Sequence, residues 1–208
     1  MNTCVIFCAG GFDSLLEPIV QGDLVIAADG GLAHVNALGQ EPHVILGDFD
    51  SLGYVPEDAR VFPVEKDDTD AMLAVRHGLR AGYQRFVLYG SLDGPRLDHT
   101  IANFQTLQFL ADHGAQGYLI GTDYMVTVVK DSSISFPATA EGIVSIFCMG
   151  NQAQGVTLEG LHYGLKKGTI HPGHPLGVSN HFTGKAATIC VESGSLLVIW
   201  DRKNGFPL

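Results

Sequence analysis

Short apolar runs alternate with amphipathic stretches in the first part of the chain. The apolar runs are rich in β-branched and aromatic residues, as is typical of strands, and they span residues 5–8, 24–28, 44–46, 60–64, 86–89 and 118–121. Apolar residues recur at helical spacing in residues 70–82 and 98–113. Strands that alternate with helices predict a parallel, Rossmann-like α/β domain.

The pattern changes near residue 122. Helical spacing disappears, and strand-like runs at residues 125–130, 143–149, 155–158, 186–191 and 196–200 are separated by turns rich in Gly, Ser, Asn and Pro. This spacing predicts an all-β sandwich. We therefore expect two domains, a parallel-sheet α/β domain over residues 1–122 and a β-sandwich over residues 123–208.

The composition is that of a globular protein with a substantial core. The 208 residues are 46% hydrophobic and 16% charged, and no apolar run approaches the length that crosses a membrane. The chain starts with a strand-like segment rather than a basic leader, so we expect no signal peptide and a cytoplasmic location. The cysteines form no C-x-x-C pair and are expected to be buried thiols; they are Cys4, Cys8, Cys148 and Cys190.

The net charge of −10 is concentrated in the first half of the chain. Residues 1–100 hold 15 Asp and Glu against 6 Lys and Arg. An acidic surface repels a phosphate backbone, so we expect no nucleic acid partner, and we expect no membrane partner either. ATP remains compatible with this charge, because a bound cation inverts the local electrostatics.

Four segments that carry aspartate crowd into the acidic half: ADGG at residues 28–31, GDFDS at 47–51, KDDTD at 66–70 and RLDH at 96–99. Each follows a predicted strand or the turn after one, and parallel sheets bind ligands at the carboxyl ends of their strands. Carboxylates gathered there repel one another unless a hard cation lies between them. Mg²⁺ prefers oxygen ligands together with substrate phosphates, so the pattern predicts a Mg²⁺–nucleotide site.

Each segment also has a purely structural interpretation. Asp48 and Asp50 point to one side of a strand end and are natural metal ligands, but a solvated turn favours the same residues. Thr69 or Asp70 would cap the helix that begins there. The chain contains no G-x-x-x-x-G-K-[ST] sequence, so it is not a P-loop enzyme.

The turn at residues 90–99, GSLDGPRLDH, follows a predicted strand. Its glycines let the backbone approach a phosphate, and Arg96 can hold phosphate with its forked guanidinium. Asp98 and His99 follow at the start of a helix, where His99 either donates to phosphate or has no chemical role. Asp93 fits an ordinary turn, and the glycines after Cys8 give only a weak turn signal.

The four segments, in this order, resemble the signatures of thiamine pyrophosphokinase (thiamin diphosphokinase), in its bacterial type. The resemblance continues at residues 155–161 (GVTLEGL), 177–180 (GVSN) and 194–198 (GSLLV), so it covers nearly the whole chain. It implies a homodimeric transferase that moves a pyrophosphoryl group from Mg-ATP to the hydroxyl of thiamine, giving thiamine diphosphate and AMP. It also implies an α/β domain that binds ATP and Mg²⁺, and a sandwich that binds thiamine and forms the dimer.

The resemblance assigns roles to particular residues. It implies a set of catalytic carboxylates that also bind the metal, namely Asp48, Asp50, Asp70 and Asp98. It implies ATP and phosphate contacts from Asp29, Gly30, Arg96 and His99. It implies thiamine contacts from Thr69, Ser179 and Asn180.

The chain departs from the family pattern at two positions. Pro95 stands where the family's loop has a second glycine, with one extra residue nearby, and proline removes a backbone donor. Lys66 stands where eukaryotic relatives carry glutamine. Three other functions fit the carboxylates alone: a pyrophosphokinase for another small alcohol such as a hydroxymethylpterin, a non-catalytic nucleotide or thiamine sensor, and a metal-dependent phosphohydrolase.

Overall fold

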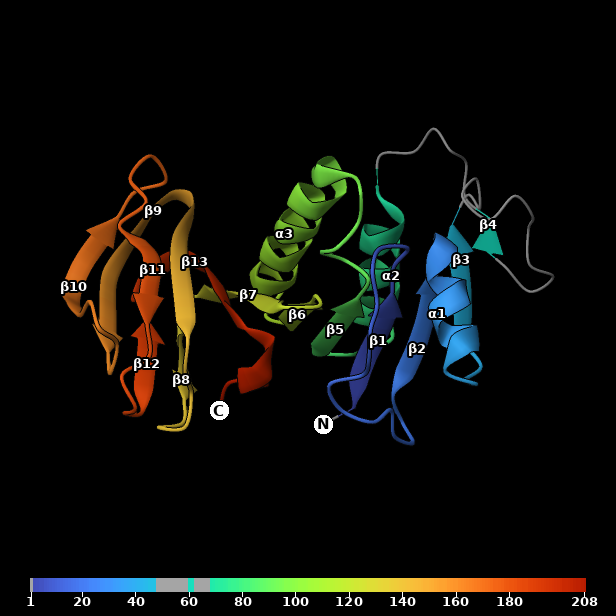
Figure 1. Cartoon of the computed structure of the whole chain (residues 1–208). Helices are drawn as coiled ribbons and strands as arrows, with labels where there is room; N and C mark the ends of the chain where they lie inside the picture. Colours follow the sequence, from blue (N-terminus) through green and yellow to red (C-terminus); the bar gives the residue numbers. More distant parts are fainter. Residues whose placement is uncertain (1, 48–59, 62–67) are drawn as a thin grey trace. The chain divides into compact units, whose positions relative to one another are not determined.

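The computed structural model describes residues 2–47, 60–61 and 68–208, and Figure 1 shows its helices and strands. The chain divides into two compact units, Met1–Thr122 (unit 1) and Asp123–Leu208 (unit 2).

Unit 1 contains a sheet of parallel strands. They are β1 (Thr3–Phe7), β2 (Leu24–Ala28), β3 (Val44–Gly47), β4 (Arg60–Val61), β5 (Arg85–Tyr89) and β6 (Gln116–Ile120). Within the unit they lie in the order β4-β3-β2-β1-β5-β6, and each neighbouring pair is parallel. The central strands β1, β2 and β5 are buried along almost their whole length, so they form the core of the unit.

The described part of unit 1 contains three α-helices. They are α1 (Leu32–Ala37), which follows the short 3-10 helix η1 (Asp29–Gly31), α2 (Asp70–Arg80) and α3 (Leu97–Asp112). The two longer helices, α2 and α3, pack against each other, and they correspond closely to the segments in which apolar residues recur at helical spacing. α2 starts after Thr69, whose Oγ1 accepts a hydrogen bond from Met72 N at 3.2 Å, as expected of a helix cap.

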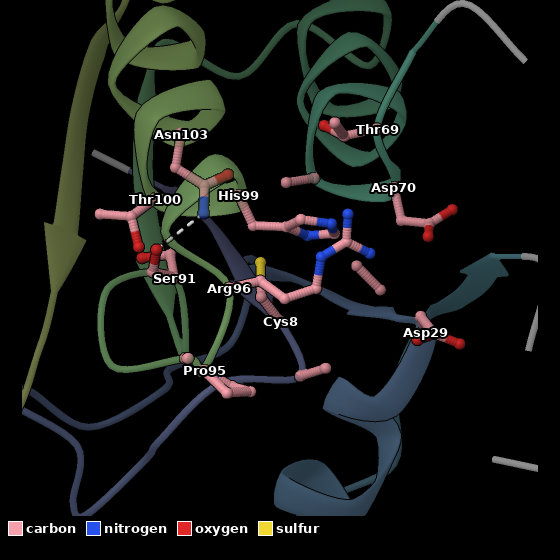
Figure 2. Close-up of a pocket in the computed structure, with 16 residues that line it drawn as sticks. Cys8, Asp29, Thr69, Asp70, Ser91, Pro95, Arg96, His99, Thr100 and Asn103 are labelled. Carbon is pink, nitrogen blue, oxygen red and sulfur yellow. Dashed lines mark hydrogen bonds between the residues drawn. The ribbon is translucent and has the colours of Figure 1, made fainter. Parts of the chain in front are cut away.

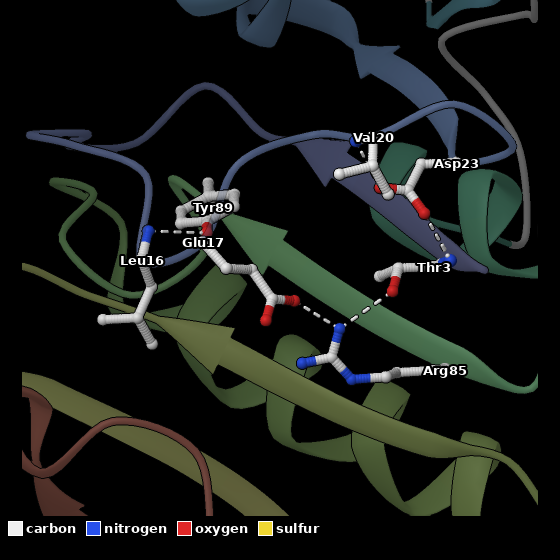
Figure 3. Close-up of polar contacts among 7 residues, drawn as sticks. All are labelled: Thr3, Leu16, Glu17, Val20, Asp23, Arg85 and Tyr89. Atoms are coloured by element: carbon white, nitrogen blue, oxygen red, sulfur yellow. Dashed lines mark hydrogen bonds and ion pairs between the residues drawn. The ribbon is translucent and has the colours of Figure 1, made fainter. Parts of the chain in front are cut away.

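Residues 8–23 connect β1 to β2 without a helix, and polar contacts hold this connection to the sheet (Figure 3). The carboxylate of Asp23 accepts a hydrogen bond from Thr3 N at 2.8 Å. The guanidinium of Arg85 pairs with Glu17 and donates to Thr3 Oγ1 at 2.8 Å. Side-chain contacts rather than a packed helix therefore hold this connection to the sheet.

The predicted fold class, a Rossmann-like parallel α/β domain joined to a sandwich, is wrong. Helices make up only 21% of the described residues, and the strand pairing among them is mixed, parallel in unit 1 and antiparallel in unit 2. A doubly wound domain needs a helix in each crossover. Residues 8–23 supply none, and α1 is only 6 residues long.

Unit 2 is built from antiparallel strands. They are β7 (Tyr124–Lys130), β8 (Ser133–Phe136), β9 (Ile143–Glu159), β10 (Leu165–Ile170), β11 (Gly177–His181), β12 (Ala187–Cys190) and β13 (Ser193–Asp201), followed by the 3-10 helix η2 (Arg202–Asn204). The long strand β9 organises the unit, because its first half pairs with β11 and β13 and its second half with β10 and β12.

Large aromatic side chains fill the core of unit 2. Trp200 is 1% exposed, and its ring meets that of Phe136 edge-on at 5.4 Å. The four cysteines are free thiols; three are buried, and Cys190 is half-buried. Among the residues that the structure describes, no helix has both the length and the apolar character needed to span a membrane.

Candidate active site

A cavity of about 310 Å³ lies at the carboxyl ends of β1, β2 and β5, beside the first turns of α2 and α3 (Figure 2). This is the edge at which parallel sheets bind ligands. Three of the four aspartate segments contribute to its lining, which consists of Cys8, Ala9, Gly10, Ala28, Asp29, Thr69, Asp70, Ala71, Gly90, Ser91, Gly94, Pro95, Arg96, His99, Thr100 and Asn103.

The main chain of two glycine-containing turns forms one side of the cavity. Gly10 N donates to Gly90 O at 2.9 Å, so the turn after β1 is joined to the turn after β5. Gly90 has a φ of +64°, and a Cβ atom there would lie 2.4 Å from Cys8 O, so only glycine fits. His34 Nε2 donates to Gly10 O at 2.8 Å. The result is a fixed backbone surface that a phosphate can approach closely.

Asp29 lines the cavity from the end of β2, and its position depends on close packing. A Cβ atom on Gly31 would lie 1.9 Å from Phe7 O, so η1 rests directly on β1. A Cβ atom on Gly47 would lie 3.1 Å from Asp29 Cα, so β3 ends beside Asp29. Gly30, the other predicted ATP contact of this segment, is half-buried and does not line the cavity.

Thr69 and Asp70 line the cavity from the start of α2. Thr69 Oγ1 caps the helix as an acceptor, and its own hydroxyl proton can still be donated to a ligand. Figure 2 shows Asp70 and Asp29 on the same side of the cavity, although they come from different elements. Two carboxylates thus face the same cavity from the described residues.

Arg96 and His99 also line the cavity, whereas Asp98 does not. The carboxylate of Asp98 is held by Arg96, through Nη2–Oδ2 at 2.6 Å and Nε–Oδ1 at 3.2 Å. Both side chains are about two-thirds exposed, at 66% and 65%. The hydrogen bond from Arg96 lowers the pKa of Asp98, and the positive charge of Arg96 acts in the same direction. Asp98 therefore stays ionised at neutral pH.

The sequence interpretation missed the residues that α3 and the turn before it add to the cavity. Asn103 donates from Nδ2 to Ser91 O at 2.7 Å, and both residues are buried. Thr100 lines the cavity one residue after His99. The signal was helical spacing: His99 and Thr100 lie four and three residues before Asn103, so these three residues share one face of α3.

The thiol of Cys8 lies in the lining of the cavity. Burial and, to a lesser extent, the charge of Asp70 raise the pKa of Cys8 to about 12. A thiol that is protonated at neutral pH is a poor nucleophile. Cys8 therefore contributes surface to the cavity rather than covalent chemistry.

In unit 2, the predicted thiamine contacts Ser179 and Asn180 lie on β11, where the pairing with β9 shifts register. Ser179 is exposed, with a φ of +57°. Asn180 is buried, and its amide is used on the protein: Oδ1 accepts from Tyr163 N at 2.9 Å, and Nδ2 donates to Tyr163 O at 2.8 Å. The ring of Tyr163 is exposed and lies edge-on to those of His162 and His181.

Asp48, Asp50 and Lys66 lie outside the described residues. Within the part of the chain that the structure does describe, no three His, Cys, Asp or Glu side chains form a group that could hold a metal ion. Of the four predicted metal ligands, the structure therefore describes two. Asp70 lines the cavity, and Asp98 does not line it but forms an ion pair with Arg96, which does.

Two family models match the chain. The catalytic domain of thiamin pyrophosphokinase matches residues 12–119, and the vitamin B1 binding domain of thiamin pyrophosphokinase matches residues 131–196. The chain belongs to the thiamin pyrophosphokinase family. It is therefore an enzyme, a kinase of the transferase class that acts in thiamine diphosphate biosynthesis, as the resemblance implied.

Solved structures of this family share the fold. The thiamine pyrophosphokinase of Bacillus subtilis is 23% identical with a TM-score of 0.85, and the match covers 96% of this chain and 99% of that one. A thiamin pyrophosphokinase family protein of Enterococcus faecalis is 24% identical with a TM-score of 0.80, covering 97% and 99%. The thiamin pyrophosphokinase of Candida albicans is 12% identical with a TM-score of 0.75, covering 96% and 88%.

These matches supply the correct fold class in place of the Rossmann-like prediction, namely the mixed-sheet fold of the thiamin pyrophosphokinases. A search of curated protein sequences found no match.

Proposed function

We propose that the enzyme transfers the pyrophosphoryl group of Mg-ATP to the hydroxyl of thiamine, giving thiamine diphosphate and AMP, and that ATP binds in the cavity of unit 1. One observation carries this proposal. Side chains from three separate aspartate segments line a single cavity, at the edge of the sheet where nucleotides bind; they are Asp29, Thr69, Asp70, Arg96 and His99.

The phosphates of ATP would lie against the backbone side of the cavity. The joined turns at Gly10 and Gly90 present main chain without side chains. The cavity also borders the first turns of α2 and α3, and helix N-termini favour anions. Arg96, just before α3, and His99, in its first turn, add donors. To bind phosphate, the guanidinium of Arg96 would share its donors between Asp98 and the nucleotide.

The residues present fit Mg²⁺. Mg²⁺ is usually held by one or two carboxylates together with substrate phosphates, rather than by a closed protein cage. Asp29 and Asp70 supply carboxylates on one side of the cavity, and Gly47, at the end of β3, lies beside Asp29. Asp70, with Asp48 and Asp50, would hold the ion with help from Asp29. When bound, Mg²⁺ would neutralise phosphate charge.

The chemical step requires one bond to form and one to break. The thiamine hydroxyl oxygen attacks the β-phosphorus in line, the bond from that phosphorus to the bridging oxygen of the α-phosphate breaks, and AMP leaves with that oxygen. The hydroxyl proton passes to a carboxylate. We assign this role to Asp70, because Asp70 lines the cavity and Asp98 does not. Arg96 offsets charge on the phosphates.

The proposed thiamine contacts are Thr69, Ser179 and Asn180. Thr69 can donate its hydroxyl proton while capping α2, and Ser179 is exposed on β11. Asn180 would act indirectly, because its amide is bound to the backbone of Tyr163. We further propose that the enzyme is a homodimer. Exposed apolar side chains in unit 2 support this, since Ile143 is 52% exposed and Val178 is 39% exposed.

The test is to incubate the full chain with Mg²⁺, ATP and thiamine and to quantify AMP and thiamine diphosphate. We expect the two products in equal amounts. Asp70→Asn should lower kcat at least about hundredfold with an unchanged far-UV spectrum. The matched control, Asp112→Asn at the far end of α3, should retain the wild-type rate.

Each of the other outcomes would indicate a different function. AMP without thiamine diphosphate would mean hydrolysis. AMP that forms only with another alcohol, such as a hydroxymethylpterin, would mean a different acceptor. No AMP with any acceptor would mean a sensor. Near-wild-type turnover by Asp70→Asn would remove the role given to that carboxylate.

A further inference from the structure

The turn between β5 and α3, residues 90–96, is held at successive carbonyl oxygens. Gly90 O accepts from Gly10 N at 2.9 Å, and Ser91 O accepts from Asn103 Nδ2 at 2.7 Å. The carbonyl of the next residue, Leu92, accepts from Thr100 Oγ1 at 3.3 Å. These contacts attach the first part of the turn to β1 and to α3, so its conformation is set by its neighbours.

Asp93 holds the turn at two further points. Its main-chain carbonyl accepts from Gly11 N at 3.1 Å, and its carboxylate Oδ2 accepts from Thr122 N at 2.6 Å. Gly11 follows β1 and Thr122 follows β6, so one residue ties the turn to the ends of two strands. A short hydrogen bond from N–H to a carboxylate is stronger than a neutral one.

The neighbouring sequence accommodates this contact. A Cβ atom on Gly121 would lie 3.0 Å from Asp93 Oδ2, so a glycine lets the end of β6 approach the carboxylate. Asp93 itself does not line the cavity. The next three residues, Gly94, Pro95 and Arg96, do line it. Pro95 has no backbone N–H and so cannot donate a hydrogen bond that would fix the turn. The part of the turn that faces the cavity thus depends on the anchor just before it.

We propose that Asp93 is a positioning residue for ATP. By holding the turn to Gly11 and Thr122, it fixes the backbone at Gly94 and Pro95 and the direction in which Arg96 enters the cavity. The inference rests on the proposed binding of ATP in this cavity. It replaces the interpretation of Asp93 as an ordinary turn residue. Asp93 anchors the same turn in which Pro95 departs from the family pattern.

The test compares three substitutions at this position. Asp93→Ala removes the acceptor, and Asp93→Ser keeps a turn-forming polar residue that is too short to reach Thr122 N. Asp93→Asn keeps a carbonyl oxygen that can accept the same hydrogen bond. Glu41→Ala, an exposed carboxylate elsewhere in unit 1, is the control. KM for ATP, KM for thiamine, kcat and the melting temperature are measured for each full-length variant.

We expect Asp93→Ala and Asp93→Ser to raise KM for ATP about tenfold and to leave KM for thiamine within about twofold. Asp93→Asn and Glu41→Ala should both stay within about twofold of wild type for both substrates. An unchanged KM for ATP in the Ala and Ser variants would overturn the proposal. So would equal rises in both KM values, or failure of both variants to fold, because each would show a general structural role.

Turnover by the wild-type enzyme distinguishes a failure of this inference from a failure of the proposed function on which it rests. If wild type forms no thiamine diphosphate from ATP, the proposed function fails. If wild type is active and Asp93→Ala keeps its KM for ATP, only the positioning role fails.

Discussion

Single residues decide how closely the segments around the cavity approach one another. Gly31 lets η1 rest on the carbonyl of Phe7, where any larger side chain would overlap the backbone. Asp29, two residues earlier, has a φ of +49°, a left-handed conformation that Asp tolerates better than most residues. The position of this carboxylate therefore depends on a neighbour that has no side chain.

Gly31→Ala tests this dependence. The new Cβ atom would lie 1.9 Å from Phe7 O, so β1 and η1 must separate. We expect the free energy of unfolding to fall by about 3 kcal/mol or more, with loss of turnover because Asp29 moves. Gly173→Ala, where a Cβ atom meets open space, should change it by less than about 0.5 kcal/mol. Urea unfolding and turnover check both, and equal stability of the two variants would contradict the packing argument.

Among the elements, the start of α2 matters most for the site, because it carries Thr69 and Asp70 into the cavity. A second contact supports it besides the Thr69 cap. Arg76 Nε lies 2.8 Å from Asp68 Oδ2, and the guanidinium carbon lies 4.5 Å from the ring centre of Phe109 on α3. Arg76 therefore links the residue before the cap to both helices.

Arg76→Lys should weaken this link while keeping the charge. Lysine cannot present two nitrogens to Asp68 or stack flat on Phe109. The pair is partly exposed, so we expect a loss of only about 0.5–1 kcal/mol in the free energy of unfolding, with a several-fold lower kcat. Arg80→Lys, on the same helix but exposed, should leave both unchanged. If Arg76→Lys and Arg80→Lys behave alike in urea unfolding and turnover, the link has no functional role.

The elements differ in how well the sequence predicts them. α2 and α3 follow the predicted helices closely, because an apolar stripe and a terminal glycine are local signals. β10 and β11 were not predicted, because lysine, glycine and serine interrupt their apolar pattern and pairing with β9 forms them. The two predicted runs at residues 143–149 and 155–158 form one strand, β9. The polar and glycine residues between them interrupt the apolar pattern and suggested a turn.

At the scale of the whole molecule, the proposed homodimer is tested by the molar mass in solution. Two copies of a 22.2 kDa chain would give twice that mass in light scattering after gel filtration. Ile143→Glu, in unit 2, should shift the mass toward one copy by placing charge in an apolar contact. Val20→Glu, at a comparably exposed position in unit 1, should leave it unchanged. A wild-type mass of one copy would contradict the dimer.

By itself, the sequence determined the family, the two-part organisation of its motifs, and the carboxylates that follow the strands, because these depend on residue types and local spacing. The tertiary structure decided which side chains share the cavity. It brings Asp29 and Asp70 together, leaves Asp98 on Arg96, and attaches Asp93 to Thr122. Contacts between residues so far apart in the chain arise only when the strands pair and the helices pack, and no local pattern encodes them.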